Sequence, residues 1–263
     1  MSTAPPTKAI LFDLDDTLVI EEPGARDAFL ATCELARTQH GLDPQALYDA
    51  VLGAARQLWY NGPHGEYVKR IGLSAWEGLW AKFTGEQAEL AALRAWAPRY
   101  KHDAWAAGLA AFDIHDADFA DALAEGYRTE RRARHVPFAE TRTVLDALYG
   151  RYRMAIVSNG VPDIQYDKLN ATHLTGYFDT VVVSADVGIG KPDPTIFTAA
   201  LTRLALAPAD AIVVGNSLTR DIAGAQRARI RAVWVNRDEP RDTDDIRPDA
   251  EIADLNGVGE LLA

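Results

Sequence analysis

The sequence predicts an α/β protein in which a doubly wound parallel sheet carries an inserted α-helical domain. Short apolar runs alternate with amphipathic stretches near the start of the chain and again from about residue 136, which is typical of a parallel sheet covered by helices. Residues 22–134 contain no comparable run and are rich in Ala, Leu and Trp. We therefore expect a sheet domain formed by residues 1–19 and 135–263, and a helical domain formed by residues 20–134.

Five short segments are predicted to be the strands of the sheet. Each is rich in β-branched residues and apolar on both faces, as strands buried between two helical layers are. In chain order they are Ala9–Phe12, Met154–Val157, Val181–Val183, Ala211–Val214 and Ala232–Val235. The amphipathic stretches between them predict helices at Phe138–Tyr149, Asp163–Asn170, Pro194–Leu204 and Asp221–Ala228.

The helical domain is indicated by helix and loop signals. It holds five of the six tryptophans of the chain, and we expect most of them in its core. Ser74 followed by Glu77 has the spacing of a capping box, which predicts a helix through Lys82. The turn residues of segment 61–65 predict a loop. The charge-dense stretch Arg237–Glu251 predicts a solvated surface loop in the sheet domain.

Composition narrows the class of protein and its partners. Of the 263 residues, 48% are hydrophobic and 25% are charged, and no apolar run approaches the roughly 20 residues that span a membrane. The first residues lack the basic and apolar regions of a signal peptide, so we expect a cytoplasmic protein without a membrane partner. A formal charge of −11 argues against a nucleic-acid partner. The single cysteine, Cys33, excludes an internal disulfide and a multi-cysteine metal site.

Polar residues follow four of the predicted strands at the point where each strand ends. Residues 13–17 follow the first strand, residues 158–160 follow the second, and the loop after the third ends in Lys191. Residues 215–217 follow the fourth strand, with Asp221 a little further on. Because ligands of open α/β sheets bind at the carboxyl ends of the strands, we expect these groups to converge there on a small molecule.

The converging groups suit a metal ion and a phosphoryl group. Clustered carboxylates repel one another unless a cation is present, and oxygen ligands without Cys or His suit Mg²⁺ best. Lys191 and the glycine-rich turns supply the donors that a phosphoryl group needs. The segment before Lys191 is not the phosphate-binding loop of ATPases, because Ala185 and Pro192 occupy two of its required positions.

These residues resemble the four motifs of the haloacid dehalogenase-like (HAD) hydrolase superfamily, in order and at fitting intervals. The helical insertion resembles the C1 cap that this family places on its Rossmann-like core. The motifs are Asp13-Leu14-Asp15-Asp16-Thr17, Ser158, Lys191, and Gly215-Asn216-Ser217 with Asp221. Further residues resemble the branch of the superfamily that holds pyrimidine 5′-nucleotidases and N-acylneuraminate-9-phosphatases. They are Asn159-Gly160, Gln165, Lys168-Leu169, Tyr177-Phe178-Asp179 and Val187-Gly188.

The resemblance implies a phosphomonoester hydrolase. Asp13 would be the nucleophile that forms an aspartyl-phosphate, and Asp15 would be the general acid and then the general base. A residue two beyond the nucleophile lies on the same side of an extended segment, which makes this division of roles geometrically possible. Ser158, the Asn159 backbone and Lys191 would bind the phosphoryl oxygens.

The resemblance also implies a Mg²⁺ cofactor. Its ligands would be the Asp13 side chain, the Asp15 carbonyl and Asp221, and the ion would offset negative charge in the transition state. Asn216 departs from the pattern, because the phosphatases of the family have Asp there. An amide oxygen can hold the ion or one of its waters but brings no charge, so we expect weaker metal binding with activity retained.

Three alternatives stay open at this point. A 2-haloacid dehalogenase of the same superfamily shares Asp13, the second motif and Lys191, but needs no Mg²⁺ and does not resemble the chain at Asp15. A phosphomutase would reuse the same site with slower hydrolysis of the aspartyl-phosphate. A catalytically weak binding protein on the same scaffold is supported only by Asn216.

The substrate class rests on the resemblance and on the helical domain. We expect the substrate to be a small phosphorylated metabolite, either a nucleoside monophosphate or a sugar phosphate. We expect the enzyme to be a monomer or a homodimer. We expect a cap to close over the site and contribute contacts. The predicted substrate contacts are Tyr60, Asn61, His64 and Trp76, since aromatic side chains and a glycine-rich loop lie together there.

Overall fold

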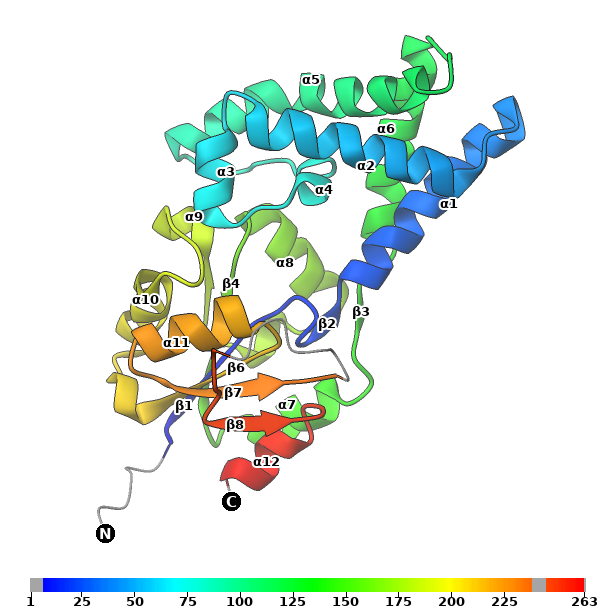
Figure 1. The fold of residues 1–263 in the computed structure, drawn as a ribbon. Coiled ribbons are helices and arrows are strands. Elements are labelled where there is room, and N and C mark those ends of the chain that lie inside the picture. The colour runs from blue at the N-terminus through cyan, green and yellow to red at the C-terminus, as the bar shows by residue number, and fades with distance from the viewer. Residues whose placement is uncertain (1–6, 238–244, 263) are drawn as a thin grey trace. The chain divides into compact units, whose positions relative to one another are not determined.

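The computed structural model describes residues 7–237 and 245–262, and it divides into two compact units. The sheet unit comprises Met1–Ile20, Val136–Asn159 and Leu169–Ala263, and the helical unit comprises Glu21–His135 and Gly160–Lys168 (Figure 1). The chain therefore crosses between the units four times. No helix among the described residues is long and apolar enough to cross a membrane.

The sheet unit contains a six-stranded sheet in the order β5-β4-β1-β6-β7-β8, and every neighbouring pair in it is parallel. A separate antiparallel pair joins β2 to β3. This confirms the predicted fold class. The strands are β1 (Ala9–Phe12), β2 (Val19–Ile20), β3 (Val136–Pro137), β4 (Arg153–Ser158), β5 (Thr180–Val183), β6 (Ala211–Gly215), β7 (Arg231–Val235) and β8 (Ala250–Ile252).

Helices cover both faces of the sheet. Along β1, Ile10 and Phe12 point into one buried cluster, while Ala9 and Leu11 point into the other. The first cluster includes side chains of α7 and α12, and the second includes side chains of α10 and α11. The helices of this part of the chain are α7 (Thr141–Leu148), α8 (Pro162–Ala171), η1 (Thr175–Tyr177), α9 (Ser184–Val187), α10 (Pro194–Leu204), η2 (Pro208–Asp210), η3 (Leu218–Ile222), α11 (Ala223–Arg227) and α12 (Gly257–Leu262).

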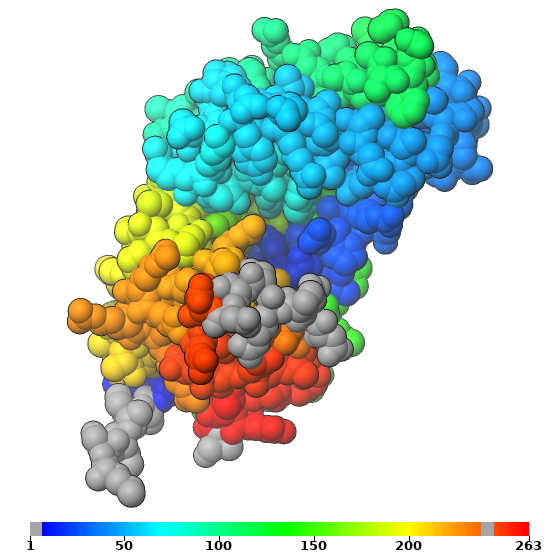
Figure 2. All heavy atoms as spheres, in the orientation of Figure 1, coloured from blue at the N-terminus to red at the C-terminus, as the bar shows by residue number. Residues whose placement is uncertain are grey.

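The helical unit is built around buried aromatic side chains. Trp59, Trp80 and Trp105 are fully buried, and the rings of Phe29 and Tyr127 lie 4.0 Å apart between their centroids. On the face shown in Figure 2 the atoms of this unit pack without a break. Its helices are α1 (Glu22–His40), α2 (Pro44–Asn61), α3 (Gly65–Ile71), α4 (Ala75–Gly78), α5 (Ala88–Ala110) and α6 (Ala117–Arg132).

The helix predicted through Lys82 is shorter than expected. The capping box is present, with Ser74 accepting from the Glu77 backbone and the Glu77 side chain accepting from the Ser74 backbone. The helix nevertheless ends at Gly78. In a longer helix the Lys82 N–H would donate to the Gly78 carbonyl, whereas here it donates to Asp163 Oδ2 at 2.7 Å. A side chain distant in sequence therefore ends this helix.

The compact helical unit begins and ends within a residue or two of the predicted helical domain. The two divisions of the chain differ in the segment that contains the start of α8. The prediction assigns residues 20–134 to the helical domain. The compact helical unit spans Glu21–His135 and also takes in Gly160–Lys168, which the prediction leaves in the sheet domain. Helix α8 consequently begins in one unit and ends in the other.

A cluster of four buried charged side chains lies within the helical unit. Lys168 Nζ is 2.9 Å from Glu21 Oε1 and 3.5 Å from Glu77 Oε1, and Arg131 pairs with the second oxygen of Glu21. Each of the four residues is at most 6% exposed. Two cations thus face two anions, so the cluster is electrically balanced. Burial raises the pKa of Glu21, but Lys168 and Arg131 outweigh burial and leave this pKa below its ordinary value of 4.5.

We expect Glu21→Gln to lower the free energy of unfolding at pH 7 by about 3–5 kcal/mol, because it leaves buried cations without their counter-charge. A carboxyl whose pKa is lowered by folding stabilises the protein above its unfolded-state pKa, and this contribution is lost as the pH falls further. The difference between wild type and variant should therefore shrink below pH 4.5. Urea unfolding across pH 3–7 measures it. Glu66→Gln, at a carboxylate with 96% exposure, is the matched control, and equal effects of the two substitutions would contradict the account.

Candidate active site

The site begins where β1 ends. The Asp13 N–H donates to the Val214 carbonyl at 2.9 Å, which extends the ladder between β1 and β6 by one residue. The chain then turns through Asp16, whose φ of 57° lies in the left-handed region. Thr17 is fully buried after this turn, and its hydroxyl lies 2.9 Å from Asp13 Oδ2. The turn thus places the Thr17 hydroxyl beside the Asp13 carboxylate.

The ammonium of Lys191 joins two of the predicted site carboxylates. Lys191 Nζ lies 2.5 Å from Asp13 Oδ1 and 2.7 Å from Asp221 Oδ1, and it donates to the Val157 carbonyl at 2.9 Å. These three contacts use the three N–H bonds of the ammonium group. Asp13, Lys191 and Asp221 are 6%, 7% and 1% exposed. The structure therefore brings together the ends of β1, β4 and β6, as the sequence predicts.

Burial dominates the electrostatics of this cluster. It raises the pKa of Asp13 to about 7, with Lys191 acting against the shift and the neighbouring carboxylates Asp221 and Asp15 adding to it. Burial alone would lower the pKa of Lys191, but Asp13 and Asp221 outweigh it and raise this pKa. The lysine is therefore a permanent cation, while the charge on Asp13 depends on what else is bound.

Thr17 also connects Asp13 to Asn216. The Asn216 N–H donates to Thr17 Oγ1 at 3.1 Å, and the Asn216 side-chain oxygen lies 3.3 Å from the same hydroxyl. One hydroxyl hydrogen can serve either Asp13 or Asn216 at a time. The Asn216 carbonyl is held by Trp234, whose indole N–H donates to it at 2.7 Å. Thr17 is the last residue of the first motif, but it is not among the site residues predicted from the sequence.

The residues of the second motif lie beside Lys191. The Asn159 side chain accepts from the Lys191 N–H at 2.7 Å and donates to the Lys191 carbonyl at 3.1 Å. This pair of bonds fixes the lysine backbone. Ser158 is 1% exposed, and its hydroxyl lies 3.3 Å from the Asn159 carbonyl. The Asn159 side chain thus holds the Lys191 backbone, a contact that the sequence does not reveal.

Arg237 is a further contact of the first motif. It donates to the Thr17 carbonyl at 3.1 Å, pairs with Glu140 at 2.6 Å, and lies 3.5 Å from the centre of the Phe138 ring. The sequence predicts a solvated loop that starts at this residue, which is wrong for Arg237 because its side chain is held on three sides. Residues 238–244 of the predicted loop lie outside the described residues, and Ala250–Ile252 form β8.

The residues at this edge fit a magnesium ion. Asp13, Asp15 and Asp221 bring three carboxyl groups to this edge, and the Lys191 ammonium is the cation that contacts Asp13 and Asp221. A dication would offset carboxylate charge there, and the available donors are oxygens, which Mg²⁺ prefers. Among the described residues no three Asp, Glu, His or Cys side chains are grouped as a metal site. The predicted ligand set needs only two carboxylate side chains, with the Asp15 carbonyl and the Asn216 amide as the other donors.

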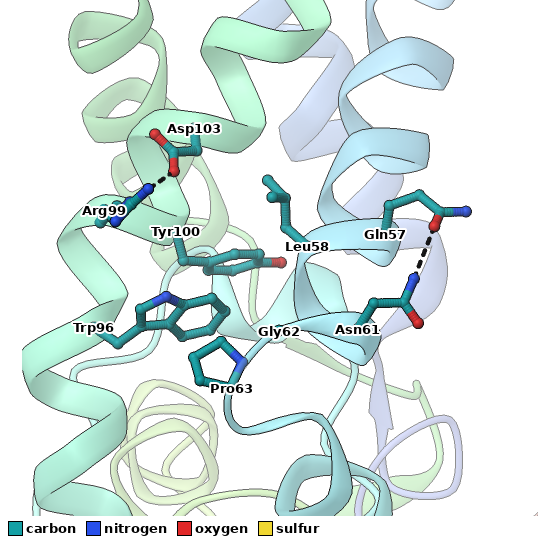
Figure 3. A pocket seen from close by; sticks show the side chains of 9 residues that line it. All are labelled: Gln57, Leu58, Asn61, Gly62, Pro63, Trp96, Arg99, Tyr100 and Asp103. Atoms are coloured by element: carbon teal, nitrogen blue, oxygen red, sulfur yellow. Dashed lines mark hydrogen bonds and ion pairs between the residues drawn. The ribbon is translucent and has the colours of Figure 1, made fainter.

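The predicted substrate contacts of the helical unit lie on several elements. Tyr60 is in the last turn of α2, His64 precedes α3 with its ring 5.4 Å from Trp96, and Trp76 lies on α4 near Arg131. A pocket of about 500 Å³ lies between α2, the turn after it and α5, and Figure 3 shows Asn61 on its wall. Its lining residues are Gln57, Leu58, Asn61, Gly62, Pro63, Trp96, Arg99, Tyr100 and Asp103. Of the four predicted contacts, Asn61 alone is in this list.

Comparison with known proteins assigns the family. The family model of haloacid dehalogenase-like hydrolases matches residues 7–229. The chain belongs to the haloacid dehalogenase-like hydrolases, which confirms the resemblance drawn from its motifs. It is 34% identical over 252 residues to the phosphoserine phosphatase of Thermus thermophilus, covering 95% of this chain and 97% of that enzyme. It is 29% identical over 257 residues to the glyceraldehyde 3-phosphate phosphatase of Methanopyrus kandleri, covering 93% and 92%.

Shorter matches reach the two enzymes of the expected branch. The Escherichia coli pyrimidine 5′-nucleotidase YjjG is 29% identical over 48% of this chain and 56% of its own length, and human N-acylneuraminate-9-phosphatase is 34% identical over 40% and 44%. With the two longer matches, these confirm the predicted enzyme class, a phosphatase of this family. Among solved structures, the putative HAD-hydrolase YfnB of Bacillus subtilis shares the fold, with a TM-score of 0.67, 22% identity and coverage of 98% and 99%.

We expect Asn216→Asp to tighten Mg²⁺ binding about tenfold, because it adds a negative charge beside a dication in a buried site. Calorimetric titration with Mg²⁺ in the absence of substrate measures this affinity. Asn256→Asp adds the same charge at an exposed position of the sheet unit and should leave the affinity unchanged. Unchanged or weaker binding in Asn216→Asp would remove Asn216 from the proposed ligand set.

Proposed function

We propose that this protein is a Mg²⁺-dependent phosphomonoester hydrolase that works through an aspartyl-phosphate on Asp13. The observation that carries the proposal is the Lys191 ammonium, which lies between the buried carboxylates of Asp13 and Asp221 at the end of the sheet. This arrangement would supply a nucleophile and a second carboxylate for a cation, each within hydrogen-bond distance of a fixed positive charge.

The contacts of Asp13 support its role as nucleophile. One carboxylate oxygen lies on Lys191 and the other on the Thr17 hydroxyl, so the group has a single orientation. An Asp13 oxygen would bond to phosphorus while the bond from phosphorus to the ester oxygen breaks. Asp15, two residues on, would give its proton to the leaving oxygen. It would then take a proton from the water that attacks phosphorus, which releases inorganic phosphate and restores Asp13.

The remaining residues of the edge would bind the phosphoryl group. Lys191 has all three N–H bonds occupied, so one present acceptor must yield to a phosphoryl oxygen when substrate binds. The Ser158 hydroxyl and the Asn159 backbone would supply the other donors. Mg²⁺, bound by Asp13, Asp221, the Asp15 carbonyl and Asn216, would supply positive charge to the developing transition state. It would also favour the ionised form of Asp13, which burial disfavours.

The relatives narrow the substrate class further than the motifs do. The two matches that cover most of the chain are named for phosphoserine and for glyceraldehyde 3-phosphate, which are both three-carbon phosphate esters. We therefore propose a small phosphorylated metabolite and place three-carbon esters beside the nucleoside monophosphates and sugar phosphates expected from sequence. The cytoplasmic location and the monomeric or homodimeric state remain predictions.

A 2-haloacid dehalogenase activity is the second candidate. The solved 2-haloacid dehalogenase of Pseudomonas syringae is 26% identical to this chain over 97% of it and 98% of that protein, with a TM-score of 0.63. Both chemistries begin with attack by an aspartate. The phosphatase needs a general acid and base two residues beyond it, and the carboxyl group of Asp15 meets this need. Asp15 therefore favours phosphate chemistry.

The proposal is tested by measuring phosphate release from a panel of phosphorylated metabolites, once in the presence of Mg²⁺ and once in the presence of EDTA. We expect release by wild type with Mg²⁺, a loss of at least about a thousandfold in Asp13→Asn, and loss of activity with EDTA. Asp254→Asn, at a carboxylate in a loop after β8, is the matched control and should retain activity. Release that persists in Asp13→Asn would contradict the role of Asp13. Halide release from 2-chloroacids without phosphate release would favour the second candidate.

A further inference from the structure

Helix α8 belongs partly to each unit. The segment Gly160–Lys168, which includes the start of this helix, is part of the helical unit, whereas Leu169 lies in the buried core of the sheet unit. The helix begins directly after the second motif, because only Gly160 and Val161 separate Asn159 from Pro162. The start of α8 is thus the covalent connection between the helical unit and a predicted phosphate-binding residue.

Charged side chains anchor this part of α8 to three separate regions of the helical unit. Lys168 pairs with Glu21, the first residue of the unit, and with Glu77. Asp163 accepts from the backbone of Lys82 at 2.7 Å and of Thr84 at 3.2 Å. The side chains of Arg132 and Asp167 are 3.2 Å apart, which ties the same segment to the end of α6.

The Lys168 anchor is buried and charged, which makes it specific. Lys168 and Arg131 are fully buried, so removing either partner of a pair leaves an uncompensated charge and is strongly unfavourable. An apolar cluster of similar volume would stabilise the fold at least as well. The role of the cluster that the geometry leaves is therefore the position of Lys168 relative to Glu21 and Glu77, rather than the stability of the fold.

The anchored segment leads into the site through Gly160 and Asn159. Gly160 has a φ of 127°, and a Cβ there would lie 2.9 Å from Gln165 Nε2 and 3.8 Å from Glu77 Oε1. The positive φ favours glycine at this position, where the chain passes close to the Gln165 side chain of α8. Asn159 comes next, and its side chain holds the Lys191 backbone through two hydrogen bonds. The start of α8 is thus connected along the chain to Asn159, and from Asn159 by hydrogen bonds to the backbone of Lys191.

We propose that Lys168 is a positioning residue that makes the start of α8 part of the helical unit and so ties that unit to Asn159 and Lys191. Lys168 touches neither the predicted nucleophile nor the substrate; it acts through the helix on which it lies. The consequence for catalysis rests on the proposed function, whereas the mechanical attachment of α8 does not.

Native-state hydrogen exchange at low denaturant tests the attachment. In wild type, amides of residues 164–168 should open with the same free energy as those of α1 and α6. The double variant Lys168→Met with Glu77→Gln removes one positive and one negative charge, so the remaining charges of Glu21 and Arg131 still balance. In this variant, the amides of residues 164–168 should exchange about tenfold faster than those of α1 and α6. Exchange of wild-type residues 164–168 together with β4 and β5 would overturn the proposal, as would an unchanged pattern in the double variant.

Phosphate release tests the consequence for the site. Corrected for the folded fraction by circular dichroism, kcat of the double variant should fall about tenfold, and Lys168→Arg should restore most of it. Lys69→Met with Glu66→Gln removes an exposed pair on α3 of the same unit and should change neither exchange nor kcat. Full kcat per folded molecule in the double variant would overturn the positioning role. Absence of phosphate release in wild type would instead contradict the proposed function, and the exchange result would still decide the attachment.

Discussion

The ammonium group of Lys191 is the interaction on which the site depends. It satisfies two buried carboxylates and one strand carbonyl with its three N–H bonds, and without it Asp13 and Asp221 would lie in the protein interior with no cation beside them. Buried charges are tolerated only when they are paired in this way. Parallel strands make the pairing possible, because the ends of β1, β4 and β6 meet at one edge of the sheet. The fold thus concentrates charge, and the lysine stabilises that concentration before any ligand binds.

The charge balance of this edge connects the structure to its chemistry. Burial raises the pKa of Asp13 to about 7, Lys191 opposes this shift, and the carboxylates of Asp221 and Asp15 add to it, so a further cation is favoured. Thr17 and Asn159 restrict the geometry, since the first orients Asp13 and the second fixes the backbone of Lys191. The helical unit balances its own buried charges among Glu21, Glu77, Arg131 and Lys168. Both units therefore contain buried ion pairs, and helix α8 carries Lys168 of the second group.

The core strands could be predicted from the sequence because each is an uninterrupted apolar run. Strand β8 could not, since it has three residues with exposed Glu251 in the middle and lies at the edge of the sheet. Asp13, Lys191 and Asp221 were predictable because each lies in the segment that leaves the carboxyl end of a strand, directly for Asp13 and some residues further on for the other two. The buried pairing of Glu21 with Lys168 was not, because a single charged residue at the start of a helix or within it has the pattern of a surface residue. Only the three-dimensional structure shows that the two meet, and the end of α4 at Gly78 has the same kind of long-range cause in Asp163.

The central claim is that the Asp13 carboxylate, held between Lys191 and Thr17, attacks phosphorus. Rapid acid quenching during turnover, followed by peptide mass spectrometry, measures this directly, because an aspartyl-phosphate survives briefly in acid. The account predicts a phosphoryl group on the peptide that contains Asp13, present only while substrate remains and absent when Asp13 is replaced by Asn. A phosphoryl group on another residue would contradict the role of Asp13. Phosphate release without a phosphorylated peptide at any quench time would also contradict this role.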